Sequence, residues 1–169
     1  MHRFPLERLY GGFWLLTTML TGVLSGYMVS HSIMFGRFFN WFIESGNLDL
    51  LHQTYTVFRA GSNAYRVYDI PLLLHLVAGT IFVILAFLVK RHRIISVLAG
   101  LSTWWVSAIF IGYGVGAAED AVLTGAADQA TTQHFLAVNL PAHTSFAVIY
   151  LASMAMLLAM PLLDRRRDR

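Results

Sequence analysis

The chain has 169 residues, of which 57% are hydrophobic and 12% are charged, and its formal net charge is +3. A soluble domain carries about 25% charged residues, so this composition excludes an ordinary water-soluble globule and predicts one integral membrane domain over residues 1–169. The lack of cysteine excludes disulfides, thiolate metal sites and cysteine-based redox chemistry. The basic residues stand at the ends of apolar stretches and not along one face, which excludes nucleic acid as a partner.

Four apolar stretches define the predicted architecture, and they cover residues 12–30, 70–89, 94–117 and 140–163. Each has close to the roughly 20 residues that an α-helix needs to cross a bilayer. We therefore expect an all-α fold, a bundle of four transmembrane helices surrounded by lipid. The first stretch is similar to a signal peptide but has no convincing cleavage site after it, so we expect it to be retained as a span.

Several short segments predict where the spans begin and how they pack. Asn139-Leu-Pro141 and Asp69-Ile-Pro71 each place a proline in an expected first turn, after a residue that can cap the helix. The short connection 90–93 predicts an antiparallel hairpin of the second and third spans. Gly112, Gly114 and Gly116 are expected inside the third span, where they would allow close helix contact or leave room for a bound group.

The segment 32–69 is too long for a simple turn and not apolar enough to span the membrane. Its large apolar residues recur at helical spacing, with interruptions at Gly46 and at Gly61-Ser62-Asn63. We expect two short amphipathic helices in this first outer loop, lying at the membrane interface as a lid over the bundle.

The basic residues predict the orientation through the positive-inside rule. Arg37, Arg59 and Arg66 fall on one side of the membrane, together with most of the acidic residues. Nine basic residues fall on the other side: Arg3, Arg8, Lys90, Arg91, Arg93, Arg165, Arg166, Arg167 and Arg169. We therefore expect a protein of the bacterial inner membrane with both termini in the cytoplasm.

Each predicted span carries one metal-binding side chain at a similar depth. His31 ends the first span, His75 lies just inside the second, Glu119 closes the third and His143 lies one turn into the fourth. Ionisable groups at membrane depth are costly and mark functional sites, and helix bundles build metal centres from such inward groups. Imidazole and carboxylate donors predict a copper or iron ion. Alternative ligands, or groups that hold the ligands in place, are His52, His134, Asp120, Asn139 and Arg66.

Taken singly, these residues have plainer interpretations. His75 can be a packing histidine bonded to a carbonyl or hydroxyl group of a neighbouring helix, and His31 can reach the lipid headgroups. A carboxylate at a helix C-terminus is disfavoured by the helix dipole, so Glu119 needs a positive partner, which a metal ion or Arg66 would supply.

The four-span layout, the long first outer loop and the segment Asn139-Leu-Pro141-Ala-His143 resemble the anthrone-oxygenase-like family of small membrane proteins. That family often has an Asn-x-Pro-x-Asn-like sequence near its last span, and here His143 stands in place of the second Asn. The resemblance implies oxidation of a hydrophobic substrate, and it makes Asn139, Pro141 and His143 positions of interest.

Three functional hypotheses follow from these patterns. The first is a metal-dependent membrane oxidoreductase, an oxygenase that acts on a lipophilic small molecule at the His/Glu site near the outer membrane face. The second is a b-type haem electron carrier, with His75 and His143 as axial ligands of haem b. The third is a non-catalytic accessory subunit of a larger membrane complex. As partners we expect the lipid bilayer, a hydrophobic small molecule, and either further copies of this chain in a homo-oligomer or a larger membrane complex. A transporter is disfavoured because no charged residue lies near the middle of a span and no repeat is visible.

Overall fold

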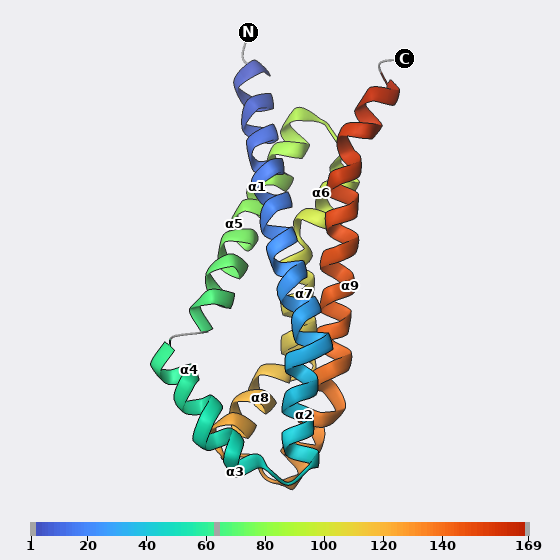
Figure 1. The fold of residues 1–169 in the computed structure, drawn as a ribbon. Helices are drawn as coiled ribbons and strands as arrows, with labels where there is room; N and C mark the ends of the chain where they lie inside the picture. The colour runs from blue at the N-terminus through green and yellow to red at the C-terminus, as the bar shows by residue number, and fades with distance from the viewer. Residues whose placement is uncertain (1–2, 63–64, 168–169) are drawn as a thin grey trace.

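The computed structural model describes residues 3–62 and 65–167, and these residues are helical almost throughout, with no β-strand among them (Figure 1). The predicted all-α class is confirmed; Asn63 and Arg169 lie outside the described residues. The elements are α1 (Arg3–Ser30), η1 (His31–Phe35), α2 (Gly36–Glu44), α3 (Leu48–Leu51), η2 (His52–Thr56), α4 (Val57–Ser62), α5 (Tyr65–Val89), α6 (Arg93–Gly100), α7 (Ser102–Gly112), α8 (Val115–Thr124) and α9 (Gln129–Arg167), where η denotes a π-helical turn.

Three of the helical segments are long and apolar enough to cross a membrane: Pro5–Glu44, Arg66–Val89 and Gln129–Asp164. The pair α6 and α7 makes a fourth candidate if it counts as one span, with a bend of 42° at Leu101. Both ends of the described chain lie at one end of the bundle, and α2, α3, α4 and α8 gather at the other (Figure 1). We call these the terminal end and the distal end.

The first helix does not stop near residue 30, which corrects the expected end of the first span; the helix expected directly after it is present as α2 but is continuous with α1. The chain continues through η1 into α2, and one apolar segment of 40 residues reaches Glu44. No proline or glycine interrupts residues 27–35, and the backbone absorbs an additional residue as a π turn, which keeps it helical. The predicted break at Gly46 is present, with a φ of +72°. Short helices α3 and α4 follow it.

The third apolar stretch is divided, which corrects the expected boundaries 94–117. Helix α7 ends at Gly112, and Gly114 adopts a φ of +64° in the turn before α8. Only glycine adopts this left-handed conformation without strain, so Gly114 serves the turn and not helix packing. Glu119 consequently lies within α8 and does not close a span.

The proline-containing segments do not begin helices, which corrects two further expectations. Helix α9 begins at Gln129, ten residues before Asn139, and the backbone N–H of Thr131 donates to the Asp128 carboxylate at 2.7 Å. Asp128 is therefore the capping residue. Pro141 and, in α5, Pro71 lie inside their helices. Helices packed in a membrane tolerate interior prolines, because neighbouring groups stabilise the interrupted backbone.

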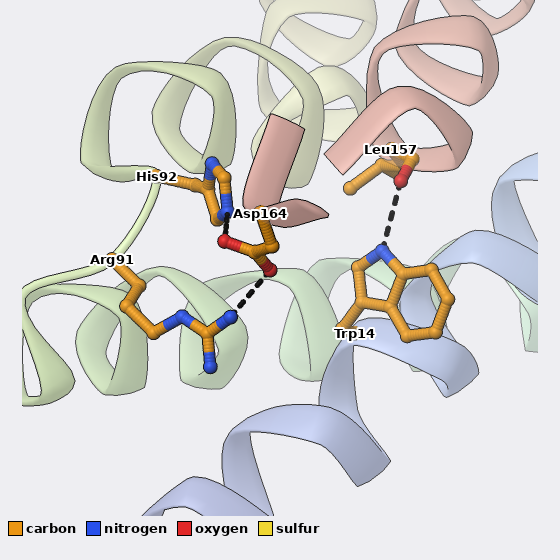
Figure 2. Close-up of polar contacts among 5 residues, drawn as sticks. All are labelled: Trp14, Arg91, His92, Leu157 and Asp164. Carbon is orange, nitrogen blue, oxygen red and sulfur yellow. Dashed lines mark hydrogen bonds and ion pairs between the residues drawn. The ribbon is translucent and has the colours of Figure 1, made fainter. Parts of the chain in front are cut away.

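The hairpin of α5 and α6 is confirmed, and the terminal end is fastened by polar contacts. Asp164 of α9 accepts hydrogen bonds from Arg91 and from His92 Nε2, the latter at 2.7 Å, and the Trp14 indole N–H donates to the Leu157 carbonyl at 2.9 Å (Figure 2). These contacts join α1 and the α5–α6 turn to α9. The two helices of the hairpin touch through glycines: a Cβ on Gly79 would lie 2.0 Å from the Gly100 carbonyl oxygen.

Candidate functional site

A cavity of about 290 Å³ lies at the distal end, and we call it the distal pocket. Its walls come from α1, η1 and α2 on one side, from η2, α4 and α5 on another, and from α7, α8 and α9. Aromatic side chains line much of it, among them Phe35, Phe39 and Phe110. Its polar lining comprises His31, Tyr55, Arg59, Tyr68, Asp69, Glu119 and His143. Ligand pockets are commonly apolar with a few converging polar groups, and this cavity fits that description.

Two of the predicted site residues form the centre of this polar lining. The imidazole rings of His31 and His143 are stacked, with centroids 3.6 Å apart and planes 18° from parallel. His31 is the first residue of η1, and His143 lies in the interior of α9, where only 6% of it is exposed. The two histidines are distant in sequence and meet because the first helix continues past Ser30 along α9.

Asn139 determines which nitrogen of each imidazole ring carries the hydrogen. Its Nδ2 donates to the Gly36 carbonyl at 3.1 Å and to Asn40 Oδ1 at 2.8 Å, so its Oδ1 faces His31 Nε2 at 3.3 Å. A carbonyl can only accept, which sets the orientation of the Asn139 amide and makes His31 Nε2 a donor. His143 Nδ1 lies 2.8 Å from the Asn139 carbonyl and must donate as well.

The remaining ring nitrogens, His31 Nδ1 and His143 Nε2, are therefore the unprotonated ones in the neutral rings. Neither makes a hydrogen bond to the residues that the structure describes. Each offers a lone pair, and both rings line the distal pocket. The pair can accept a proton or a hydrogen bond from a molecule bound there.

Glu119 lies in the same pocket but faces a cation. Its carboxylate is 3.9 Å from the Arg59 guanidinium, and its side chain is 21% exposed. Burial raises the pKa of Glu119; Arg59 lowers it and Asp120 raises it further. Burial also raises the pKa of Tyr55, one helical turn before Arg59. The cation that pairs with Glu119 is thus Arg59, a residue that sequence reasoning left out of the site.

His75 does not line the pocket. It is fully buried between helices, with Nε2 2.8 Å from Thr21 Oγ1 and Nδ1 2.8 Å from Thr103 Oγ1. Thr21 donates its own proton to the Thr17 carbonyl, so His75 Nε2 donates to Thr21 and Thr103 donates to His75 Nδ1. The Tyr150 hydroxyl then donates to Thr103 Oγ1 at 2.9 Å. The packing interpretation of His75 accounts for both of its nitrogens.

The other two distal histidines fasten helix ends. His52 Nε2 donates to the Val122 carbonyl at 2.7 Å, near the end of α8, and His134 Nε2 donates to the Tyr113 carbonyl at 2.9 Å, just after α7. Carbonyls at helix C-termini often lack partners within the helix, and His134 supplies a donor to such a carbonyl. The Val122 carbonyl already accepts from the Gly125 N–H at 3.3 Å, and His52 adds a second donor to it. These histidines hold the distal segments in place.

The expected metal centre needs at least three donors around one point. In the parts of the chain that the structure describes, no three His, Asp or Glu side chains are arranged to hold one ion. His75 is bonded elsewhere, and Glu119 faces Arg59. The donor set that remains, His31 and His143, does not fit a copper or iron centre. The haem pairing of His75 with His143 likewise requires His75 to leave two threonine hydroxyls.

Sequence reasoning found three residues of the distal pocket, His31, Glu119 and His143. It missed Arg59 and Tyr55, which lie on the helical arm formed by α3, η2 and α4. Their spacing of one turn in a segment that was expected to be helical was the available signal. The protein matches no family model, no curated protein and no solved structure. Membership of the anthrone-oxygenase-like family therefore stays a prediction.

Proposed function

We propose that the protein is a membrane enzyme that binds a lipophilic small molecule in the distal pocket and removes a proton from it through the His31–His143 pair. The observation that supports this most directly is the arrangement around Asn139, which leaves one unprotonated nitrogen on each stacked ring. A base in a largely apolar cavity is poorly solvated by water, so a bound acidic O–H or activated C–H group becomes its partner.

The substrate class follows from the lining of the pocket. Phe35, Phe39 and Phe110 favour a flat aromatic molecule, and two lone pairs at one position favour a phenolic or enolic hydroxyl group. About 290 Å³ lies at the small end of the roughly 300–1,000 Å³ that ligand pockets span, which suits one or two fused rings.

Proton transfer needs compensation for the charge that it creates. When His143 Nε2 takes the proton, the substrate becomes an anion and the ring becomes a cation. Stacked rings at 3.6 Å cannot both be charged without strong repulsion, so the pair accepts one proton at a time. Arg59 lines the same cavity and supplies positive charge toward the anion.

The expected oxygenase activity is compatible with this site if the reaction with dioxygen begins by removal of a proton from the substrate. An activated CH₂ group loses a proton to His143, and the resulting carbanion adds dioxygen as the oxidant. The peroxide that forms takes up the proton and loses water, which leaves a ketone. The chain's own contribution is to bind and orient the substrate and to hold the transferred proton.

The orientation expected from the basic residues belongs to this proposal. With both termini in the cytoplasm of a bacterium, the distal pocket faces the periplasmic side of the inner membrane. The concentration of Lys and Arg near the terminal end supports it.

The proposal is tested with 4-nitrophenol, whose phenolate absorbs in the visible. In full-length protein in mild detergent, we expect binding to increase the phenolate fraction at a pH below the pKa of the free phenol. His143→Asn, whose side-chain N–H stands at the position of Nδ1 and can still donate to the Asn139 carbonyl but which offers no basic nitrogen, should abolish that increase. His134→Gln is the matched control, because glutamine can still donate to Tyr113. The same increase of the phenolate fraction in His143→Asn as in the unmodified protein would refute the proposal.

Elemental analysis of the same preparations gives an independent check. If the protein carries stoichiometric copper or iron, and the metal is lost in His31→Gln and in His143→Asn, the proposal of proton transfer is wrong and the site is a metal centre.

A further inference from the structure

A second hollow of about 270 Å³ lies between α7 and α9, and we call it the α7–α9 groove. It is lined by Ile109, Tyr113, Ala137, Val138, Pro141, Ala142 and Ser145, and none of these described residues is charged. Two features of α9 leave this space open. The lining positions of α9 are small or medium-sized, and Pro141 cannot donate a backbone hydrogen bond to the preceding turn, which loosens the helix there.

The groove and the distal pocket lie on two sides of the same helix contact. On α7, Ile109 lines the groove and its neighbour Phe110 lines the pocket. On α9, Ala142 lines the groove and its neighbour His143 lines the pocket. Successive residues of a helix point about 100° apart, so the two hollows meet at the wall between these pairs.

Phe110 lies at that wall, partly buried and packed against the cluster that contains Phe146. Its ring lies 6.3 Å from the Phe146 ring and covers Gly116, where an added Cβ would come within 2.5 Å of the Phe110 ring. The ring therefore packs directly on the backbone of α8, and joining the two hollows requires a change of the Phe110 rotamer.

We propose that the α7–α9 groove holds the hydrocarbon chain of the substrate whose acidic head occupies the distal pocket, with Phe110 as the gate between them. The inference rests on the proposed function and extends it from an aromatic head to an amphipathic molecule with an alkyl or prenyl tail. The groove lies between Gln129–Asp164, which is apolar enough to span a membrane, and α7, which reaches that length only together with α6. Its lining carries no charged side chain, and its polar side-chain groups are the Tyr113 and Ser145 hydroxyls, so an apolar chain suits it better than a charged ligand.

The test uses a photoreactive probe, a 4-hydroxybenzoate ester whose seven-carbon chain ends in a diazirine, with full-length protein in lipid nanodiscs. After illumination, mass spectrometry should find the label on groove residues such as Ile109, Tyr113 and Val138. Excess methyl 4-hydroxybenzoate, which has the head alone, should reduce this labelling at least tenfold. The same alkyl diazirine without the phenol reports labelling by plain lipid contact.

Two matched variants make the result specific. Ala137→Phe fills the groove and should reduce labelling there at least tenfold, whereas Val148→Phe places the same ring on an exposed position of α9 outside the groove and should have no effect. Both variants should retain the 4-nitrophenol signal, which depends on the pocket alone.

Each outcome has a defined meaning. Labelling outside the groove, or groove labelling that the methyl ester does not compete, overturns the inference while an intact 4-nitrophenol response leaves the proposed function standing. A missing 4-nitrophenol response refutes the proposed function itself, and groove labelling then reports an ordinary lipid contact.

Discussion

Thr103 is the residue whose replacement should most clearly reveal what holds the middle of the bundle together. It donates to His75 Nδ1 at 2.8 Å and accepts from the Tyr150 hydroxyl at 2.9 Å, so it joins α7 to α5 and α9. Thr103→Val keeps the shape of the side chain and removes both contacts. His75 and Tyr150 are completely buried, so water cannot replace the lost partner.

The expected cost follows from the two polar groups that lose a partner. A buried group left without one costs about 1–3 kcal/mol, whereas hydrogen bonds between membrane helices average about 0.6 kcal/mol and reach about 1.7. We therefore expect Thr103→Val to lower the free energy of unfolding by about 1–3 kcal/mol. Thr18→Val is the control, since the Thr18 hydroxyl only donates to the Trp14 carbonyl of its own helix. It should cost less than about 0.5 kcal/mol.

The assay is equilibrium unfolding in mixed micelles with increasing SDS, followed by tryptophan fluorescence. Tyr150→Phe removes one of the two groups that Thr103→Val leaves without a partner, so the double variant should lose less stability than the sum of the single variants. Strict additivity, or equal losses in Thr103→Val and Thr18→Val, would show that the hydrogen-bond chain through His75 contributes nothing to stability.

Three further predictions concern other parts of the fold. Gly79→Ala should cost more than about 3 kcal/mol or prevent folding, because its methyl group would lie 2.0 Å from the Gly100 carbonyl oxygen; expression and melting temperature test this. Glu119 has a pKa raised above its ordinary value of 4.5, so its contribution to stability is complete below pH 4.5 and is lost as the pH rises through the folded-state pKa. Glu119→Gln should therefore reduce the fall of the melting temperature between pH 4.5 and 7, and an identical pH profile would contradict the assigned cause. Asp164→Asn, at a half-exposed contact with Arg91, should cost no more than about 1 kcal/mol by SDS titration.

The sequence was sufficient for the class of the fold and for part of the site. Composition and apolar length predicted membrane helices, because both depend on sums over many residues. The predicted helix boundaries were wrong where they depended on one local signal, such as a proline after a capping residue, because tertiary packing can override such a signal. Pro141 and Asn139 form a typical helix start, yet Asp128 caps α9 earlier, and the Asn139 amide is used to hold His31.

The site was partly predictable for a related reason. Depth in the membrane can be counted along a helix, and this placed His31 and His143 at one level. Rotation about the helix axis cannot be counted in the same way, and it decides that His75 faces Thr21 and Thr103 instead of the pocket. Arg59 belongs to a short helical arm whose position depends on the turn at Gly46, and no pattern in the sequence fixes where such an arm lies.

The π turn at residues 31–35 has a consequence for how this chain tolerates a change of length. A π turn is an α-helix with one residue too many, so deleting a single residue there would produce a more regular helix. The same deletion would turn everything after it by roughly 100° relative to α1. Asn40 and the Gly36 carbonyl would then leave Asn139, and the two histidine rings would lose their common support. In this segment a more regular helix would disassemble the pocket, so the additional residue of the π turn is a condition for the site.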